Sequence, residues 1–290
     1  MKIRHYLYNA FTIEEDGLKL AIDPGQNLYM FNKKSLIPET EWDSITHILV
    51  THGDPDHFAF ATPLAKKAGA EVFCGMGLEA DFIAEGIMRP HSMIAGETSI
   101  SNKLKIEGLK VKHGSLPVKM LGGAVYVKGE VRESDRGGQE VYLAGIRIQK
   151  IEKPMKVFSH GTVKLLFGLI RLEKDNLDFA RGSIGYKISM NGKTIVNLGD
   201  SLLMEDWKGL KPDILMLPIG GGKVPNTMDV QAAIEAVDLI SPGLVIPCHY
   251  NVPYGLSKNI NPTDDVYFKN EVEKRGTKCE LLNNGDELVI

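Results

Sequence analysis

The sequence predicts a layered α/β fold that carries an inserted β-rich region, and three observations lead to this prediction. Short apolar segments typical of buried strands alternate with segments of helical periodicity near both ends of the chain. The middle of the chain, residues 101–158, is rich in β-formers, glycine and charge and has no clear helical pattern. Three apolar segments end directly in His or Asp residues, and layered α/β folds gather functional groups at such strand ends.

The N-terminal part is predicted to consist of short strands followed by strand–helix units. Asn9-Ala10 breaks the first apolar stretch, and the turn signal Asp23-Pro24-Gly25 ends the third strand. The predicted strands are residues 2–8, 10–14, 18–22, 45–50 and 70–74, and the predicted helices are residues 58–68 and about 78–86.

The middle region, residues 101–158, differs from the rest of the chain in its charge. It holds 12 Lys and Arg against 6 Asp and Glu, whereas the whole chain has a formal net charge of −3. We expect a β-hairpin insertion within a single domain of residues 1–290. Solvated strands with lysine on exposed edges would explain the charge; binding of an anionic substrate or partner is the alternative.

The C-terminal part returns to alternating strands and helices. Asn191-Gly192 is typical of a hairpin turn. Thr227 is predicted to cap the helix that follows it, with Asp229 in the first turn. The predicted strands are residues 185–190, 194–198, 214–218 and 244–247, and the predicted helix is residues 228–240.

Composition excludes several classes of protein. The net charge of −3 gives no indication of nucleic-acid binding. No window reaches the roughly 18 uninterrupted apolar residues of a membrane helix, and the first residues do not resemble a signal peptide. Three cysteines without a CxxC pair make a disulfide framework and a cysteine zinc site improbable. We therefore expect a cytoplasmic protein that does not associate with membranes.

A polar segment after the strand at 45–50 carries the main chemical signal. His52, Asp54, Asp56 and His57 place four metal-competent side chains within six residues. A turn and helix cap flanked by histidines is the structural alternative, but imidazole and carboxylate together suit zinc, iron or manganese. The strand at 194–198 leads to Asp200 and the strand at 244–247 leads to His249. We expect these three strand ends to converge in one cleft.

The arrangement of these segments resembles the metallo-β-lactamase superfamily, whose motif is written HxHxDH and reads H-x-D-x-D-H here. Asn197-Leu198-Gly199-Asp200-Ser201 and Pro247-Cys248-His249-Tyr250 are similar to two further segments of that superfamily. Ile22-Asp23-Pro24 and Leu217-Pro218-Ile219-Gly220-Gly221 resemble the branch that contains L-ascorbate-6-phosphate lactonase and related metal-dependent hydrolases. The resemblance covers most of the chain outside residues 101–158.

The resemblance implies a four-layer αββα fold that holds one or two divalent metal ions. By this resemblance His52 binds the first metal, and Asp56, His57 and His249 bind the second. Asp200 bridges the two. A further histidine ligand is expected between the motif and Asp200, and the candidates are His160, which we prefer for its spacing, and His113, which is otherwise an exposed strand histidine.

Two positions depart from the pattern of the family. Asp54 replaces the second histidine of the motif, and a carboxylate is a harder ligand than imidazole, so the site is expected to favour manganese or iron over zinc or to leave the first position weak. Asn9 stands where the branch often has a histidine, which puts an N-terminal ligand in doubt. Asp54 remains among the candidate metal ligands.

The ligand set predicts a hydrolase that uses a metal-bound hydroxide on an ester, lactone or phosphoester. Asp56 is the candidate catalytic residue, because it can orient or deprotonate the attacking water. The expected partner is a small-molecule substrate, for which the charge of residues 101–158 favours an anion, and the chain is compatible with a homo-oligomer. The alternatives are a non-catalytic metal-binding interaction protein on the same fold and an iron oxidoreductase resembling flavodiiron proteins.

Overall fold

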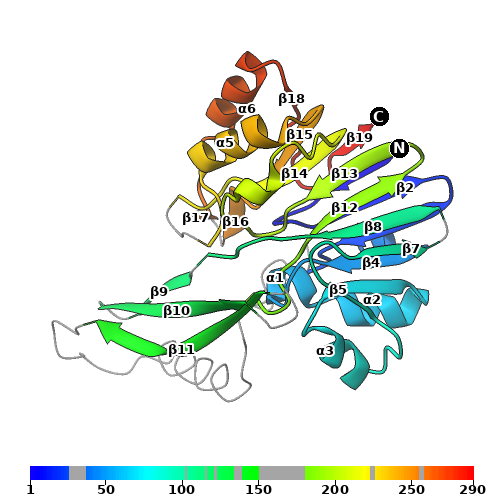
Figure 1. Ribbon diagram of the computed structural model, residues 1–290, viewed down its shortest axis with the longest axis horizontal. Helices are drawn as coiled ribbons and strands as arrows, with labels where there is room; N and C mark the ends of the chain where they lie inside the picture. The colour runs from blue at the N-terminus through cyan, green and yellow to red at the C-terminus, as the bar shows by residue number, and fades with distance from the viewer. Residues whose placement is uncertain are drawn as a thin grey trace.

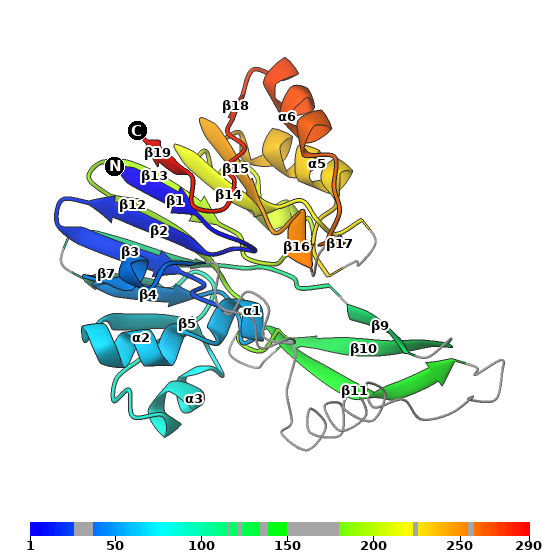
Figure 2. The same cartoon turned by 180° about the vertical axis from the view of Figure 1, so that it is seen from behind.

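Two seven-stranded sheets face each other at the centre of the molecule, and helices cover their outer faces (Figures 1 and 2). This arrangement is a four-layer αββα fold, as the sequence predicts. The computed structural model describes residues 1–25, 37–101, 103–114, 116–120, 123–133, 139–149, 180–222, 226–254 and 258–290.

The first sheet is built from the N-terminal part of the chain and closed by the last strand. Its order is β19-β1-β2-β3-β4-β5-β6, antiparallel from β19 to β3 and parallel from β3 to β6. The strands are β1 (Lys2–His5), β2 (Phe11–Glu15), β3 (Leu18–Ile22), β4 (His47–Val50), β5 (Glu71–Gly75), β6 (His91–Met93) and β19 (Glu287–Val289).

The second sheet combines one hairpin from the middle of the chain with the C-terminal strands. Its order is β18-β15-β14-β13-β12-β8-β7, parallel from β18 to β13 and antiparallel from β13 to β7. The strands are β7 (Thr98–Ser101), β8 (Leu104–Leu109), β12 (Gly185–Met190), β13 (Lys193–Asn197), β14 (Ile214–Pro218), β15 (Leu244–Cys248) and β18 (Lys278–Cys279).

The helices lie on the outer faces of the sheets. The first sheet is covered by α2 and α3, and the second by α5 and α6 (Figure 1). The helices are α1 (Pro55–Phe58), α2 (Ala61–Ala68), α3 (Glu79–Ala84), α5 (Val230–Ile240) and α6 (Asp265–Lys274), with short 3-10 turns η2 (Glu39–Trp42) and η3 (Glu205–Trp207).

Burial on both faces explains why the central strands are uniformly apolar. Every residue of β4 and β14 is buried, because a helix covers one side and the opposite sheet covers the other. In α5 the buried residues Ala233, Ala236, Val237 and Ile240 follow the helical period, as predicted. Three apolar clusters therefore hold the four layers together: one between the sheets, and one between each sheet and its helices.

The cap of α5 corrects one prediction from the sequence. The predicted N-cap, Thr227, is wrong: Asp229 caps the helix, and its carboxylate accepts a hydrogen bond from the amide of Ala232 at 2.9 Å. Thr227 is instead buried, and its hydroxyl donates to the carbonyl of Ser201 at 3.1 Å. Its side chain is thus engaged in fixing the loop that follows β13.

The predicted helix over residues 58–68 is divided into two. The short α1 begins earlier, at Pro55, because proline at the first helical position is compatible with the missing amide donor. The longer α2 ends at Gly69, which adopts φ +64 in the left-handed region. This division gives the polar segment after β4 a helical turn of its own.

The region 101–158 contributes to two different sheets. Its first strand, β8, is part of the sandwich, whereas β9 (Leu116–Met120), β10 (Gly123–Glu133) and β11 (Gln139–Gln149) form a separate antiparallel sheet. Figure 1 shows this three-stranded sheet projecting to one side of the sandwich, beyond α1. A two-stranded sheet, β16 (Val252–Tyr254) and β17 (Lys258–Ile260), follows β15. Within the described residues no helix is long and apolar enough to cross a membrane.

Candidate metal centre

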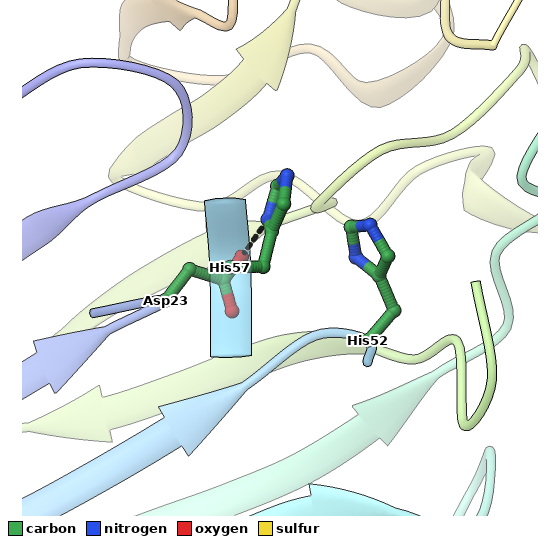
Figure 3. Close-up of side chains that lie close together, drawn as sticks. All are labelled: Asp23, His52 and His57. Atoms are coloured by element: carbon green, nitrogen blue, oxygen red, sulfur yellow. Dashed lines mark hydrogen bonds and ion pairs between the residues drawn. The ribbon is translucent and has the colours of Figure 1, made fainter. Parts of the chain in front are cut away.

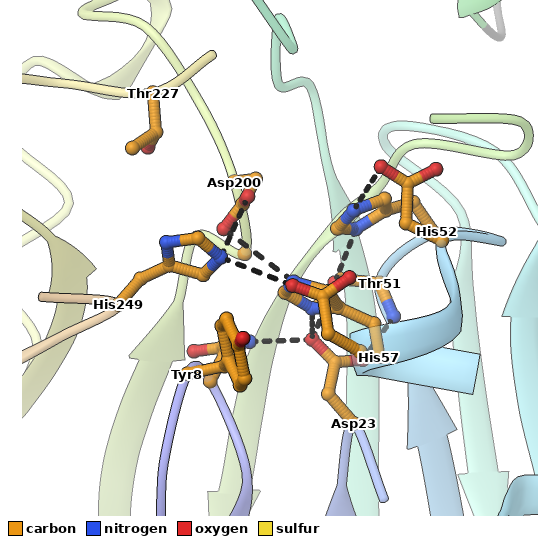
Figure 4. Close-up of polar contacts among 12 residues, drawn as sticks. Tyr8, Asp23, Thr51, His52, His57, Asp200, Thr227 and His249 are labelled. Carbon is orange, nitrogen blue, oxygen red and sulfur yellow. Dashed lines mark hydrogen bonds and ion pairs between the residues drawn. The ribbon is translucent and has the colours of Figure 1, made fainter. Parts of the chain in front are cut away.

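Polar side chains from both sheets meet at one end of the sandwich. His52 follows β4, Asp200 follows β13, and His249 follows β15. His113 comes from the segment that continues β8, and His57 lies on α1. All five side chains are buried. Parallel strands present their carboxyl ends at the same edge of a sheet, so the two sheets together bring these residues into one cluster. Figure 4 shows His52, His57, Asp200 and His249 gathered there.

A close backbone approach positions α1, which carries Asp56 and His57. A β-carbon on Gly25 would lie only 1.7 Å from the carbonyl oxygen of Asp56, so no other residue fits there without displacing the helix. The segment Asp23-Pro24-Gly25 therefore ends β3 and also determines the position of α1.

The first group of side chains consists of His52, Asp54, His113 and Asp200. Nε2 of His52 lies 3.5 Å from Oδ2 of Asp54, and Nε2 of His113 lies 3.8 Å from the same oxygen. Nε2 of His113 is also 3.7 Å from Oδ2 of Asp200. The other oxygen of Asp54 accepts a hydrogen bond from the amide of Ala180 at 2.6 Å, which fixes the carboxylate so that Oδ2 faces the histidines.

The second group consists of Asp56, His57, His249 and the same Asp200. Nε2 of His57 and Nε2 of His249 lie 3.6 and 3.5 Å from Oδ2 of Asp56. Asp200 approaches both imidazoles, with Oδ1 at 3.7 Å from His57 and Oδ2 at 3.1 Å from His249. Asp200 therefore lies between the two groups, in the position required of a shared ligand.

The four histidines share one orientation, which indicates what the centre is built to hold. Each Nδ1 lies within hydrogen-bonding distance of a neighbouring polar group, whereas each Nε2 is buried without a hydrogen-bond partner among the described residues. The Nδ1 neighbours are Thr51 Oγ1 for His52, Asp23 Oδ2 for His57, the Gly114 carbonyl for His113 and the Asn261 amide for His249. Buried polar groups are rarely left unpaired, and four inward Nε2 atoms beside carboxylates are the donor set of a metal site.

Asp23, which the sequence placed in a turn and in a segment resembling the family, was not among the predicted site residues, yet it contacts the cluster directly. Its carboxylate accepts hydrogen bonds from the amide and hydroxyl of Thr51 at 2.6 and 2.5 Å, from Asn9 Nδ2 at 2.6 Å and from His57 Nδ1 at 2.7 Å. Figure 3 shows the last of these contacts, with the ring of His57 standing between Asp23 and the centre. A carboxylate behind a histidine fixes its tautomer and directs Nε2 towards a metal. The signal in the sequence was an Asp at a strand end, as at Asp200.

The electrostatics of the centre favour a cation. Burial opposes charge on His57, but the carboxylates of Asp56, Asp200 and Asp23 outweigh it and raise its pKa to about 10. Burial likewise opposes charge on Asp54, yet His52, His113 and the Ala180 amide bring its pKa down to about 2. The carboxylates are thus ionised in a buried setting, where a bound metal ion would offset their charge.

Six of the seven residues predicted as metal ligands come together in the cluster: His52, Asp54, Asp56, His57, Asp200 and His249. The seventh, His160, lies outside the described residues. Its rival His113 lies in the cluster, and at 2% exposure it is not the exposed strand histidine of the alternative interpretation. A close backbone approach also occurs beside His249, since a β-carbon on Gly220 would lie 2.1 Å from the carbonyl oxygen of His249.

The chain belongs to the beta-lactamase superfamily, because residues 2–249 match the beta-lactamase superfamily domain. With its fold and its cluster of histidines and carboxylates, it falls in the class of metal-dependent hydrolases of the metallo-β-lactamase superfamily. A protein of Carboxydothermus hydrogenoformans named as a UPF0173 metal-dependent hydrolase is 26% identical over 296 residues, which cover 100% of each chain.

Two solved structures show the same fold. Igni18, described as a metallo hydrolase from the archaeon Ignicoccus hospitalis, has a TM-score of 0.66 at 20% identity, covering 99% of this chain and 97% of that chain. CmlA, a diiron β-hydroxylase from Streptomyces venezuelae, has a TM-score of 0.62 at 14% identity, covering 100% of this chain and 54% of that chain. At these identities the likeness concerns the fold alone.

Proposed function

We propose that the protein hydrolyses a small ester, lactone or phosphoester with two divalent metal ions. The first metal is held by His52, Asp54 and His113, the second by Asp56, His57 and His249, and Asp200 is shared by both. The observation that carries this proposal is the set of four buried histidine Nε2 atoms that lie beside aspartate carboxylates and have no hydrogen-bond partner in the described part of the chain. His113 takes the place that the sequence analysis preferred to give to His160.

The protein's own residues have distinct parts in this reaction. When bound, the metals would acidify a water molecule and polarise the substrate oxygen under attack. Asp56 is the most exposed of the ligand carboxylates, with 21% of its side chain accessible against 2% for Asp200. It is therefore the carboxylate that can orient the attacking water and accept its proton, while the buried histidines hold the centre rigid.

We further propose that the first metal is manganese or iron rather than zinc. The first group offers two imidazoles and two carboxylates, and carboxylates suit harder cations better than imidazole does. Asp54 supports this assignment, because one of its oxygens is held by the amide of Ala180 and the other is left to face His52 and His113.

An iron oxidoreductase is the second candidate function, and it rests on the same carboxylate at position 54. An iron oxidoreductase differs from a hydrolase in that protein purified without air would consume dioxygen when an electron donor is supplied. A protein that holds iron but consumes no dioxygen, and that hydrolyses an ester or phosphoester, excludes this candidate.

We also propose a cytoplasmic location and an anionic substrate. All three cysteines, Cys74, Cys248 and Cys279, are buried free thiols, which is consistent with a reducing compartment. The excess of Lys and Arg in residues 101–158 supports attraction of an anion. The proposal of an anionic substrate would be supported if added salt slowed the hydrolysis of anionic substrates but not of neutral ones.

The experiment that tests the proposed function is metal content per chain, measured by elemental mass spectrometry after metal loading. The wild type is expected to retain about two equivalents, and the double variant Asp56→Ala with His57→Ala about one. The loaded wild type is then screened against lactones, esters and phosphoesters. A wild type that binds no metal, or a loaded protein that hydrolyses none of the three classes, contradicts the proposal.

A further inference from the structure

The turn between β1 and β2, residues 6–10, reaches from the first sheet to the metal centre. Tyr8 at its tip adopts φ +58, a left-handed conformation that bulky residues rarely take. The turn is closed by a hydrogen bond from the Tyr6 amide to the Ala10 carbonyl at 2.8 Å. Such a conformation persists only where the surrounding structure enforces it, and these positions are frequent at functional sites.

Tyr8 contacts His249 of the second group in two ways. Its carbonyl accepts a hydrogen bond from the backbone amide of His249 at 2.9 Å, and its ring lies edge-on to the imidazole with centroids 5.2 Å apart. His249 itself has φ +57, so the end of β15 is also left-handed. Figure 4 shows Tyr8 below His249, on the side of Asp23. Two strained residues from opposite sheets therefore hold each other in place.

Asn9, the next residue of the turn, leads to His57. Its Nδ2 donates to Asp23 Oδ2 at 2.6 Å and to Asn197 Oδ1 at 3.0 Å. Its Oδ1 accepts from Asn197 Nδ2 at 3.0 Å and from Cys248 Sγ at 3.3 Å. The whole network is buried, and Asp23 Oδ2 is the atom that accepts the hydrogen bond from His57. Asn9 thereby ties the first sheet to β13 and β15 of the second.

We infer that the β1–β2 turn positions both imidazoles of the second metal site, Tyr8 acting on His249 directly and Asn9 acting on His57 through Asp23. This inference rests on the proposed function, because it requires that the second group binds a metal. In the first group, His113 takes its Nδ1 contact from the Gly114 carbonyl, away from the turn. His52 contacts Thr51 Oγ1, so it reaches Asp23 only through Thr51, whose backbone amide Asp23 also holds. Loss of the turn contacts should therefore weaken the second metal far more than the first.

Asn9→Leu tests the inference, since leucine has a similar size and makes no hydrogen bonds. The variant is made in two backgrounds, His52→Ala, which keeps only the second metal, and His249→Ala, which keeps only the first. We expect the dissociation constant for Mn²⁺ to rise 10- to 100-fold in the first background, the range known for groups that orient a metal ligand. In the second background we expect a change of less than about threefold.

Thr12→Val is the matched control. Thr12 is also buried, lies on β2 just after the turn, and donates a hydrogen bond of 2.6 Å to Glu41, away from the metal centre. This change should lower the melting temperature and leave both dissociation constants unaltered. A purely structural role of Asn9 would give the Thr12→Val result, with a lower melting temperature and intact metal affinities, and would overturn the inference.

Tyr8→Gly is a second variant, which tests the inference even if the Asn9→Leu variant does not fold. Glycine adopts φ +58 without strain, so the turn can form while the ring against His249 is lost. We expect weaker Mn²⁺ binding in the His52→Ala background alone. Unchanged binding there, or equal weakening in both backgrounds, overturns the inference. Failure of the proposed metal centre is distinguishable, because then the unmodified chain binds no Mn²⁺. Failure of the proposed hydrolysis is distinguishable as well, because it leaves the Mn²⁺ dissociation constants of all the variants measurable.

Discussion

At the residue scale, the centre depends on which nitrogen of each histidine is left for a metal. The contacts of Asp23 and the Gly114 carbonyl engage Nδ1 of His57 and His113, so Nε2 is the nitrogen left to bind a metal in place of a proton. The same logic gives Asp200 its importance, since each of its oxygens faces a different imidazole.

Asp200→Ala is expected to lower metal content from about two equivalents to below one, because a shared carboxylate serves both metals. The measurement is elemental mass spectrometry of the loaded variant. Asn226→Ala is a suitable control, since Asn226 lies beside Asp200, with Nδ2 at 3.4 Å, but offers no carboxylate. Unchanged metal content in Asp200→Ala would mean that Asp200 is not the shared ligand.

His113→Ala and His160→Ala, compared side by side, decide which histidine completes the first group. His113 lies 3.7 Å from Asp200 and 3.8 Å from Asp54, so its removal should lower metal content by about one equivalent. His160→Ala should retain both equivalents. The opposite pattern would restore the preference that the sequence alone gave to His160.

At the element scale, short segments carry the ligands because turns and caps fix their direction. The helix α1 has only four residues, and its place depends on Gly25 rather than on its own helical stability. The stability of the longer α5 instead depends on its cap at Asp229 and on the buried apolar residues along one side of the helix. These residues pack against β14 and β15 on the outer face of the second sheet.

Gly25→Ala is expected to displace α1, because a β-carbon at that position would lie 1.7 Å from the carbonyl oxygen of Asp56. The second metal should bind at least tenfold more weakly, as measured by titration with Mn²⁺. Gly17→Ala is the matched control, because Gly17 has a positive φ but no atom within 4 Å of an added β-carbon. It should cost some stability and leave metal binding intact.

Asp229→Ala removes the cap of α5 and should lower the free energy of unfolding by about 1 kcal/mol. Chemical denaturation measures the change. Gln231→Ala, on an exposed position in the first turn, should have an effect below about 0.5 kcal/mol. Equal effects of the two substitutions would mean that the observed bond to the Ala232 amide contributes nothing to stability.

At the scale of the whole molecule, stability against acid depends on buried carboxylates. Burial alone would raise the pKa of Glu41, but hydrogen bonds from Thr12 and Tyr6 and the charges of Lys19 and Arg4 prevail and lower it from 4.5. A carboxylate whose folded pKa is lowered stabilises the fold above its unfolded pKa. This contribution is lost as pH falls through the folded pKa.

Glu41→Gln should therefore destabilise the protein by about 1–3 kcal/mol at neutral pH, because it removes the buried charge that pairs with Arg4 and Lys19. The difference from wild type should shrink as pH falls below 4.5. Denaturant unfolding at several pH values measures both. A difference that stays constant down to the folded pKa would show that the charge of Glu41 does not stabilise the fold.

The sequence by itself determined the layered α/β class, the strands that end in functional residues and six of the seven candidate ligands that the cluster contains. Local pattern suffices for these, because buried strands are apolar and because His and carboxylates gathered at strand ends are typical ligands of zinc, manganese and iron. His57, Asp200 and His249 could therefore be named before their positions in space were known.

Only the tertiary structure revealed which residues stand behind the candidate ligands and that His113 lies among them. The sequence drew attention to Asp23, Asn9 and His113 but could not give their contacts, which span as many as 239 positions, as between Asn9 and Cys248. The cap at Asp229 and the close approach at Gly25 likewise depend on exact backbone geometry. Periodicity predicts which face of a strand or helix is buried, but packing of the two sheets determines what each buried polar group meets there.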